Sequence, residues 1–387
     1  MKLLDRWNSA DINLRFFLIG IFLFGINNGI LLTTFNNYLN DIFRLSATER
    51  GFLEFPRELP GFMLVAVTGI LSSYSIRAWA IMVGVISAAG VLGLGFMSPN
   101  IYLMTFWMMT WSLSDHLFMP VESVMGLHLA ADGKQGKRLG QISGSRNLAM
   151  IFGAGAVWVY GNIFTGTIYP GLFAFAAVAS IGAAFAFSKV KVAKDAANGK
   201  KRFVIKAEYK LFYILNILFG ARKQIFLTFA PWVFVTVFGT KPETMAILIL
   251  ISSIAGVVFR QVFGALTDIV GERKMFMADS IILLGVCAGF ALSKNLYLLY
   301  FLFITDNLMF ATRIARTTYL NRIALSKSDI PATISTGITM DHVVSMTIPA
   351  FGGMLWIAYG YEAVFFAASI VAVLSFVTAL MVDKKKK

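Results

Sequence analysis

Long apolar runs alternate with short polar segments along almost the whole chain. A helix needs about 20 apolar residues to cross the hydrocarbon core of a bilayer, and runs of that length recur along this sequence. We therefore expect an all-α membrane protein with twelve transmembrane helices. The predicted helices span residues 14–38, 51–74, 77–97, 101–126, 139–161, 168–188, 211–238, 243–266, 275–293, 296–321, 331–357 and 361–382.

One connection is longer and more polar than the others. Residues 189–210 are rich in Lys and Ala, and six predicted helices lie on each side of them. This pattern predicts an N-terminal six-helix bundle over residues 1–188, a cytoplasmic basic linker over 189–210, and a C-terminal six-helix bundle over 211–387. Two related six-helix halves are common in secondary transporters.

Internal echoes support the idea of two related halves. Residues 23–33 read LFGINNGILLT, and residues 218–228 read LFGARKQIFLT. Gly69 precedes Gly264 by the same interval, and the sequence SDHL at 114–117 resembles TDNL at 305–308. Apolar segments match by chance easily, but three echoes near half the chain length favour an internal repeat.

Composition agrees with a membrane-embedded chain. Of its residues, 58% are hydrophobic and 14% are charged, with a mean hydropathy of +0.73, whereas soluble domains carry about 25% charged residues. The formal net charge is +14, and most basic residues fall in segments on the same side as the N-terminus. The positive-inside rule then places both termini in the cytoplasm, in a multi-pass protein of the plasma (inner) membrane. The charge thus indicates topology and contact with anionic lipids, and we expect no nucleic-acid partner.

Several kinds of chemistry have no motif in this sequence. Cys287 is the only cysteine, so an internal disulfide is excluded. No H-E-x-x-H zinc motif and no G-x-x-x-x-G-K-[ST] phosphate loop is present. We therefore expect no metal, no cofactor and no enzyme activity.

A charged turn between two apolar runs carries the clearest motif. Residues 264–274 read GALTDIVGERK. Gly264 and Gly271 allow close helix approach and unusual turn geometry, while Asp268 can pair with a cation or accept hydrogen bonds. Arg273 and Lys274 would hold the turn in the cytoplasm. A simpler interpretation is an ordinary cytoplasmic hairpin.

The pattern G-x-L-x-D-x-x-G-x-R-K resembles the loop signature of the major facilitator superfamily. Residues 35–51, Pro120 with GKRLG at 136–140, and PAFGG at 349–353 are also similar to that family's first outer loop, fourth helix with its following loop, and eleventh helix. The resemblance implies two pseudo-symmetric six-helix bundles whose first, fourth, seventh and tenth helices line a central cavity. The first-half loop has Ser73 or a neighbour in place of the aspartate, and the fifth helix lacks the proline of many drug exporters.

Charged residues inside predicted helices are the functional candidates, because an ionised group in the bilayer core is costly unless it is paired or hydrated. Arg222 and Lys223 lie near the middle of the seventh helix, and the repeat aligns them with Asn27 and Asn28. With Arg313 on the tenth helix, these residues would bind a carboxylate, phosphate or polyhydroxyl solute. Alternatively, Arg222 and Lys223 form structural ion pairs with Asp306 or Asp341.

Other charged residues are candidates for proton coupling and gating. A buried carboxylate or a histidine can load a proton near neutral pH, which makes coupling candidates of Asp115, Asp306, Asp341 and His342. Helix–helix hydrogen bonds or salt bridges are the alternative roles. Three further sets combine opposite charges and are the candidates for gating. Two of them pair residues on different helices: Glu122 with Arg313, and Arg146 with Asp341–His342. The third is the local triad Glu54, Arg57 and Glu58, whose helical spacing favours ion pairs and which we interpret as an outer gate.

These observations predict a secondary active transporter. We expect it to move a small polar or anionic organic solute (a sugar, sugar acid or organic acid) by alternating access, in symport with protons rather than Na⁺, and as a monomer. Proton-coupled export of amphipathic compounds is the alternative within transport. A membrane-embedded receptor or enzyme is the alternative from another class, with no motif in its favour.

Overall fold

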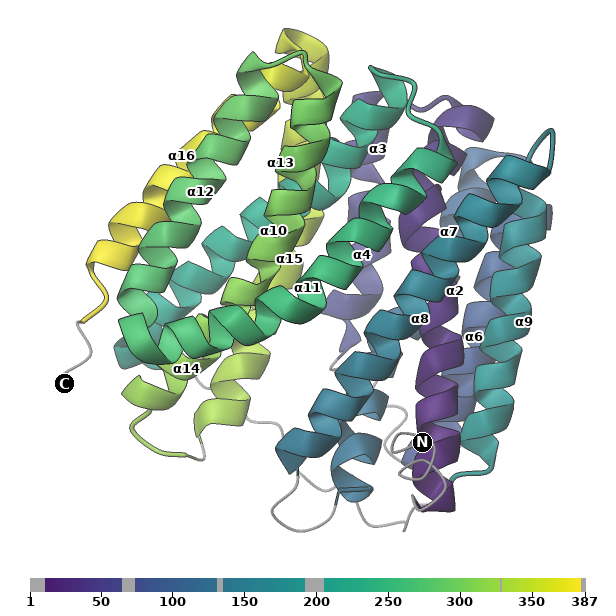
Figure 1. Cartoon of the computed structure of the whole chain (residues 1–387), viewed down its shortest axis with the longest axis horizontal. Helices are drawn as coiled ribbons and strands as arrows, with labels where there is room; N and C mark the ends of the chain where they lie inside the picture. The colour runs from purple at the N-terminus through teal and green to yellow at the C-terminus, as the bar shows by residue number, and fades with distance from the viewer. Residues whose placement is uncertain (1–10, 65–73, 131–134, 192–204, 328, 384–387) are drawn as a thin grey trace. The chain divides into compact units, whose positions relative to one another are not determined.

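The computed structural model describes residues 11–64, 74–130, 135–191, 205–327 and 329–383 (Figure 1). Parts of the predicted linker, of the second helix and of the degenerate first-half loop lie outside these residues. Helices account for nearly all of the described chain, and no strand occurs in it. Eight of the described helices are long and apolar enough to cross a membrane, which agrees with the all-α membrane protein expected from the sequence.

The chain folds into two compact units, each made of three segments. Unit 1 contains residues 1–38, 63–199 and 242–250, and unit 2 contains residues 39–62, 200–241 and 251–387. The units therefore interleave along the sequence: each includes one short segment from the other half of the chain. The three-part division predicted from the sequence stays a prediction.

Unit 1 is built from long helices. It holds most of α2 (Ile12–Phe43), then α6 (Ile76–Phe96), α7 (Ile101–His128), α8 (Gln135–Ile163), α9 (Tyr169–Ser188) and the start of α11 (Pro242–Val270). Helix α6 packs along α7 and α9. Phe17, Phe24, Phe118 and Phe187 meet in the core, where burial of aromatic surface stabilises the packing.

Unit 2 contains the remaining elements. They are α3 (Ala47–Phe52), α4 (Glu54–Phe62), a 3₁₀ turn η2 (Ala207–Tyr209), α10 (Lys210–Thr236), the rest of α11, α12 (Glu272–Leu292), α13 (Leu296–Met309), η3 (Phe310–Thr312), α14 (Arg313–Ile323), α15 (Asp329–Tyr359) and α16 (Tyr361–Leu380). Helix α15 packs against α3, α4 and α10, and α12 packs along α16. Unit 2 thus brings α3 and α4, from early in the chain, to α10 and α15.

Two of the predicted spans are interrupted. The predicted helix 296–321 contains the 3₁₀ turn η3, where the Thr312 hydroxyl donates to the Met309 carbonyl at 2.7 Å. The predicted helix 51–74 begins earlier, at Ala47, and divides at Leu53 into α3 and α4. In α4, Pro56 and Pro60 have no amide hydrogen to donate to a helical hydrogen bond. In the other interrupted span, η3 is a 3₁₀ turn inside a long helix, and such a turn often marks a hinge.

The start of α3 shows how the sequence sets a helix end. The Ser46 hydroxyl accepts from the Glu49 amide at 3.2 Å, and the Glu49 carboxylate accepts from the Ser46 amide at 2.7 Å. This reciprocal arrangement is a capping box. It fixes the entry of the chain into α3 and thereby the positions of the charged residues that follow.

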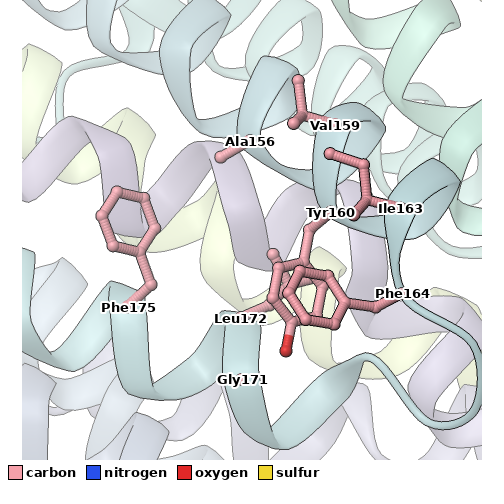
Figure 2. A pocket seen from close by; sticks show the side chains of 8 residues that line it. All are labelled: Ala156, Val159, Tyr160, Ile163, Phe164, Gly171, Leu172 and Phe175. Atoms are coloured by element: carbon pink, nitrogen blue, oxygen red, sulfur yellow. The ribbon is translucent and has the colours of Figure 1, made fainter.

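An apolar groove lies between the end of α8 and the start of α9 (Figure 2). Its volume is about 330 Å³, and its lining includes Tyr160, Ile163, Phe164 and Phe175. The rings of Tyr160 and Phe164 stack with their centroids 4.0 Å apart. A lining with so few polar groups suits hydrocarbon, so the site of a polar solute is sought elsewhere.

Candidate functional site

Three consecutive polar residues on α10, Arg222, Lys223 and Gln224, each contact a different neighbouring segment of unit 2. The Arg222 side chain is only 2% exposed. Its Nη1 donates to Asp279 Oδ1 at 2.7 Å, and its Nη2 donates to Asp306 Oδ1 at 2.9 Å. One guanidinium therefore joins α10 to α12 and α13, and its planar fork of donors suits two carboxylates at once.

A second arginine lies beside this cluster. The Arg316 guanidinium, on α14, is buried and lies 3.4 Å from the centroid of the Phe219 ring on α10. Arg316 also lines a cavity of about 20 Å³ together with Arg222 and Asp279. A cavity of this size has room for about one water molecule. The two arginines and the two aspartates around Arg222 balance in charge, which lowers the cost of their burial.

Lys223 contacts α15. Its ammonium group pairs with the Asp341 carboxylate, and the two side chains are 20% and 23% exposed. Because both side chains are part-exposed whereas Arg222 is buried, this pair is easier to open than the contacts of Arg222. The pairs of Arg222 with Asp306 and of Lys223 with Asp341 are the ion pairs that the sequence offered as the alternative role of these cations.

Gln224 extends the chain of contacts to α4. Its amide nitrogen donates to Glu54 Oε2 at 2.7 Å. Glu54 also binds Arg50, at 2.5 Å, and Arg57, at 2.6 Å. Arg57 in turn binds Glu58 at 2.6 Å, so the local ion triad of Glu54, Arg57 and Glu58 expected from the sequence is present.

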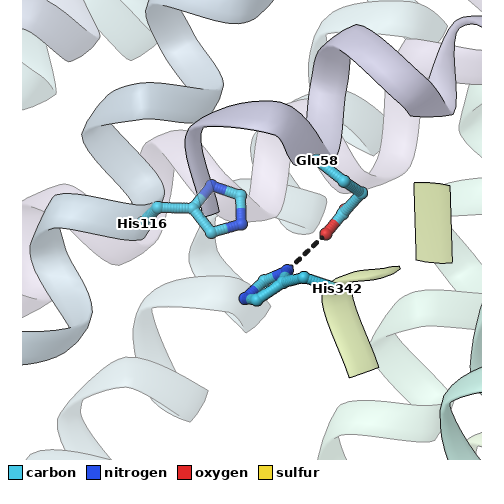
Figure 3. A group of neighbouring side chains, drawn as sticks. All are labelled: Glu58, His116 and His342. Carbon is cyan, nitrogen blue, oxygen red and sulfur yellow. Dashed lines mark hydrogen bonds and ion pairs between the residues drawn. The ribbon is translucent and has the colours of Figure 1, made fainter. Parts of the chain in front are cut away.

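The chain of contacts returns to α15 through a histidine. Figure 3 shows the His342 ring and the Glu58 carboxylate facing each other, with His342 Nδ1 2.9 Å from Glu58 Oε2. Both side chains are buried. Polar contacts therefore run from Asp306 on α13, through α10 and α4, to His342 on α15. We call the residues from Asp306 and Asp279 through Arg222–Gln224, Glu54, Arg57 and Glu58 to Asp341 and His342 the charge network.

Backbone contacts bring α3 and α15 very close together beside this network. A Cβ atom at Gly51 would lie 2.1 Å from the Pro349 carbonyl oxygen, and one at Gly353 would lie 2.4 Å from the Ala47 carbonyl oxygen. The Thr48 hydroxyl donates to the Gly353 carbonyl at 3.1 Å. We call this contact the α3–α15 seam. Only glycine fits at these two positions without moving the helices apart.

The candidates in unit 1 have partners of their own. Glu122 on α7 binds Arg146 on α8 at 2.8 Å. Sequence spacing suggests Arg313 for Glu122 and Asp341–His342 for Arg146, and the structure gives different partners because α7 and α8 are adjacent in the same unit. Arg313 is exposed.

The amides and the remaining acid of unit 1 lie among its helices. Asn27 is fully buried on α2 and donates to the Ser87 hydroxyl, which contacts the Ser180 hydroxyl at 3.2 Å. Asn28 and Asp115 are half-buried. These contacts tie α2 to α6 and α9.

The charged turn at 264–274 joins α11 to α12. Gly271 has a φ of 81° and separates the two helices, as expected for a glycine in unusual turn geometry. Gly264 lies within α11, and no described atom lies within 4 Å of a Cβ built there, so the expected close approach at Gly264 is not seen among the described residues. Asp268 and Lys274 are exposed, and Arg273 is half-buried.

Sequence reasoning misses three members of this site or its surroundings. Asp279 lies inside the predicted helix 275–293, but close to its start and only five residues after Lys274, and it is absent from the candidates proposed from the sequence. Gln224 is uncharged, so a search for charged residues within helices does not find it. Arg50 lies in a predicted outer loop, but its side chain is 4% exposed. Its spacing of four residues from Glu54 is the available signal.

Comparison with known proteins identifies the fold. The sequence model of the Major Facilitator Superfamily matches residues 212–387. The structure of the nucleoside transporter NupG covers 97% of this chain and 100% of its own, with a TM-score of 0.76 and 15% identity. The match to this family thus covers the C-terminal part of the chain, and the whole chain has the fold of NupG.

A second solved structure has the same fold. It is a bacterial homologue of the human lysosomal transporter Spinster in an inward-facing and occupied conformation, with a TM-score of 0.72, 13% identity, and coverage of 95% of this chain and 96% of that one. No curated protein matches the sequence. The chain thus combines eight described helices that are long and apolar enough to cross a membrane with the fold of these two transporters.

Proposed function

We propose that this chain is a member of the Major Facilitator Superfamily and a proton-coupled symporter of a small polar or anionic organic solute, such as a sugar, sugar acid or organic acid. The charge network is the observation that supports the proposal. Ionised groups inside the hydrocarbon core of a membrane cost free energy, and they commonly mark the pathway of a substrate or an ion. A transporter of apolar compounds has less need of charged side chains on its seventh and eleventh helices than a transporter of polar or anionic solutes.

The solute-binding set proposed from the sequence is Asn27, Asn28, Arg222, Lys223 and Arg313. Within it, Lys223 is the best placed to exchange partners, because its pair with Asp341 is part-exposed. A carboxylate or phosphate on the solute would replace Asp341 as the partner of Lys223. Arg222 would instead hold α10 in position through its contacts with Asp279 and the buried Asp306.

Protons would enter through the acids and histidine proposed for coupling. Asp115, Asp306, Asp341 and His342 remain the candidates, and protons are favoured over Na⁺. The charged turn with Gly264, Asp268, Gly271, Arg273 and Lys274 would stabilise one conformer of the cycle. Both termini would face the cytoplasm, in the inner membrane, and the monomer would be the working unit.

A ligand screen on purified protein tests the proposal. Sugars, sugar acids, organic acids and nucleosides are added singly at pH 5.5 and pH 7.5, and the melting temperature is recorded; nucleosides are included because of the fold shared with NupG. A ligand at 100 times its dissociation constant stabilises the folded state by about 2.7 kcal/mol. We expect a shift with one polar class, larger at one pH, and confirmed by uptake into proteoliposomes.

A matched variant controls this screen. Lys223→Gln removes the charge at a part-exposed position, so the protein should fold but lose the shift with anionic ligands. A wild-type protein stabilised only by amphipathic compounds would contradict the proposal and favour the exporter alternative.

A further inference from the structure

The Glu58–His342 contact differs from every other ion pair in the charge network. Glu54, Asp279, Asp306 and Asp341 bind arginine or lysine, and these cations keep their charge across the physiological pH range. His342 is the one basic member of the network whose side-chain type changes charge near neutral pH. His342 is therefore the member of the network that is best suited to bind and release a proton during a transport cycle.

The charges around His342 allow a proton to bind there reversibly. Arg50 and Arg57 already balance Glu54 and Glu58, and Lys223 already balances Asp341. These six groups sum to zero charge when His342 carries no added proton, so no uncompensated acid among them holds the proton permanently. The Glu58 carboxylate already makes this hydrogen bond charge-assisted, and the bound proton turns it into an ion pair between an imidazolium and a carboxylate, which adds a direct electrostatic attraction.

The contact also joins two elements that meet at the α3–α15 seam. Glu58 lies on α4 and His342 on α15, and the seam is formed by the preceding helix α3 and the same α15. Both side chains of the contact are buried, so a change in its strength is not screened by solvent. Charge on His342 therefore changes the stability of the seam directly.

We propose that Glu58 and His342 form a reversible proton-binding site, and that the bound proton holds the α3–α15 seam closed. The proton comes from water and adds to Nε2 of His342, because Nδ1 faces Glu58. The imidazolium then pairs with the Glu58 carboxylate, and the proton returns to water when the seam opens. This inference rests on the proposed proton-coupled function and names its coupling site.

The charged and polar groups around the pair set the direction of the pH effect. From α4, Glu58 attracts the proton and Arg57 opposes it. Asp341 and Lys223 offset each other, and Gln224 on α10 is uncharged. Because the closed seam keeps Glu58 against His342, closing is favoured at acid pH, and this contribution is lost as the imidazole deprotonates at higher pH.

A neighbouring contact would link the proton to the solute. Asp341 directly precedes His342 on α15 and pairs with Lys223. Movement of α15 after proton release would draw Asp341 away from Lys223 and free its ammonium group. The solute site and the proton site would then respond to one displacement of α15.

Distance measurements across the seam test the proposal. The full chain, with Cys287→Ser as background, receives spin labels at Phe52→Cys on α3 and Phe351→Cys on α15, where the native side chains are 50% and 65% exposed. Electron–electron double resonance is recorded in lipid nanodiscs from pH 5 to pH 9. We expect the ratio of short to long distances to fall about tenfold as the pH rises, the size expected for one strengthened hydrogen bond.

Two variants remove the titration in different ways. His342→Gln keeps a hydrogen-bond donor for Glu58 but cannot take up a proton, and Glu58→Gln keeps the shape but removes the charge. Each should give a distance ratio that is independent of pH. His128→Gln, at an exposed histidine on α7, should keep the wild-type profile. A wild-type profile in both His342→Gln and Glu58→Gln, or a flat profile in wild type, would overturn the proposal.

Transport separates this inference from the proposed function. His342→Gln should still exchange labelled for unlabelled solute across proteoliposomes but should not accumulate it against a gradient. If wild type shows the pH-dependent distances but no proton-driven accumulation, the proton site stands and the proposed symport fails. If accumulation occurs and His342→Gln accumulates solute as well as wild type, the coupling site is wrong and symport stands.

Discussion

Arg222→Ala should abolish transport and lower the free energy of unfolding by about 3–5 kcal/mol. The reason is that Arg222 is the shared cation of Asp279 and Asp306, and removing one partner leaves buried charge without compensation. Thermal unfolding of the purified protein and solute uptake into proteoliposomes measure the two effects. Arg222→Lys should recover only part of the stability, since an ammonium group lacks the planar fork that reaches both carboxylates.

Lys223→Ala is the matched control for this prediction. It removes the adjacent cation, whose pair with Asp341 is part-exposed, so the loss of stability should stay within about 1 kcal/mol. Equal melting temperatures for Arg222→Ala and Lys223→Ala would contradict the structural role given to Arg222.

Gly51→Val should hold the α3–α15 seam open and reduce transport at least tenfold. Its first added carbon would lie 2.1 Å from the Pro349 carbonyl oxygen, and a backbone atom cannot rotate away as a side chain does. Overpacking of this kind costs about 1–3 kcal/mol, which is enough to shift a two-state equilibrium by one or two orders of magnitude. Labelling of Thr48→Cys with a maleimide, in the Cys287→Ser background, reports on the seam.

Two other glycines provide the comparison. Gly155 and Gly256 have no described atom within 4 Å of an added Cβ. In the Thr48→Cys protein, Gly155→Ala and Gly256→Ala should therefore leave the rate of maleimide labelling and the transport rate unchanged. Gly51→Val should make the labelling faster. If Gly51→Val labels at the wild-type rate and still transports, the seam does not take part in the cycle.

Most of the helix pattern could be predicted because bilayer thickness imposes it. Apolar runs of the required length gave α6, α9 and α12 to within a few residues of their observed ends. The interruptions at Leu53 and at Phe310–Thr312 were missed, because they depend on prolines and on a local hydroxyl contact within an otherwise continuous apolar run.

The pairing of charges could be predicted only where partners are close in sequence. Glu54, Arg57 and Glu58 lie within two helical turns, and helical spacing gave their ion pairs. Asp279 was missed as a partner of Arg222, because the two lie on helices far apart in the chain and sequence alone does not show which faces meet. The alternative ion pairs for Arg222 and Lys223 were anticipated because so few intramembrane acids were available.

Proton movement during solute uptake tests the central claim most directly. Proteoliposomes in a lightly buffered medium receive the solute found in the ligand screen, and the external pH is followed with an electrode. A symporter removes protons from the medium together with the solute, so we expect alkalinisation that stops when a protonophore is added and that is absent with empty liposomes. Solute uptake with no change of external pH would contradict proton-coupled transport by this chain.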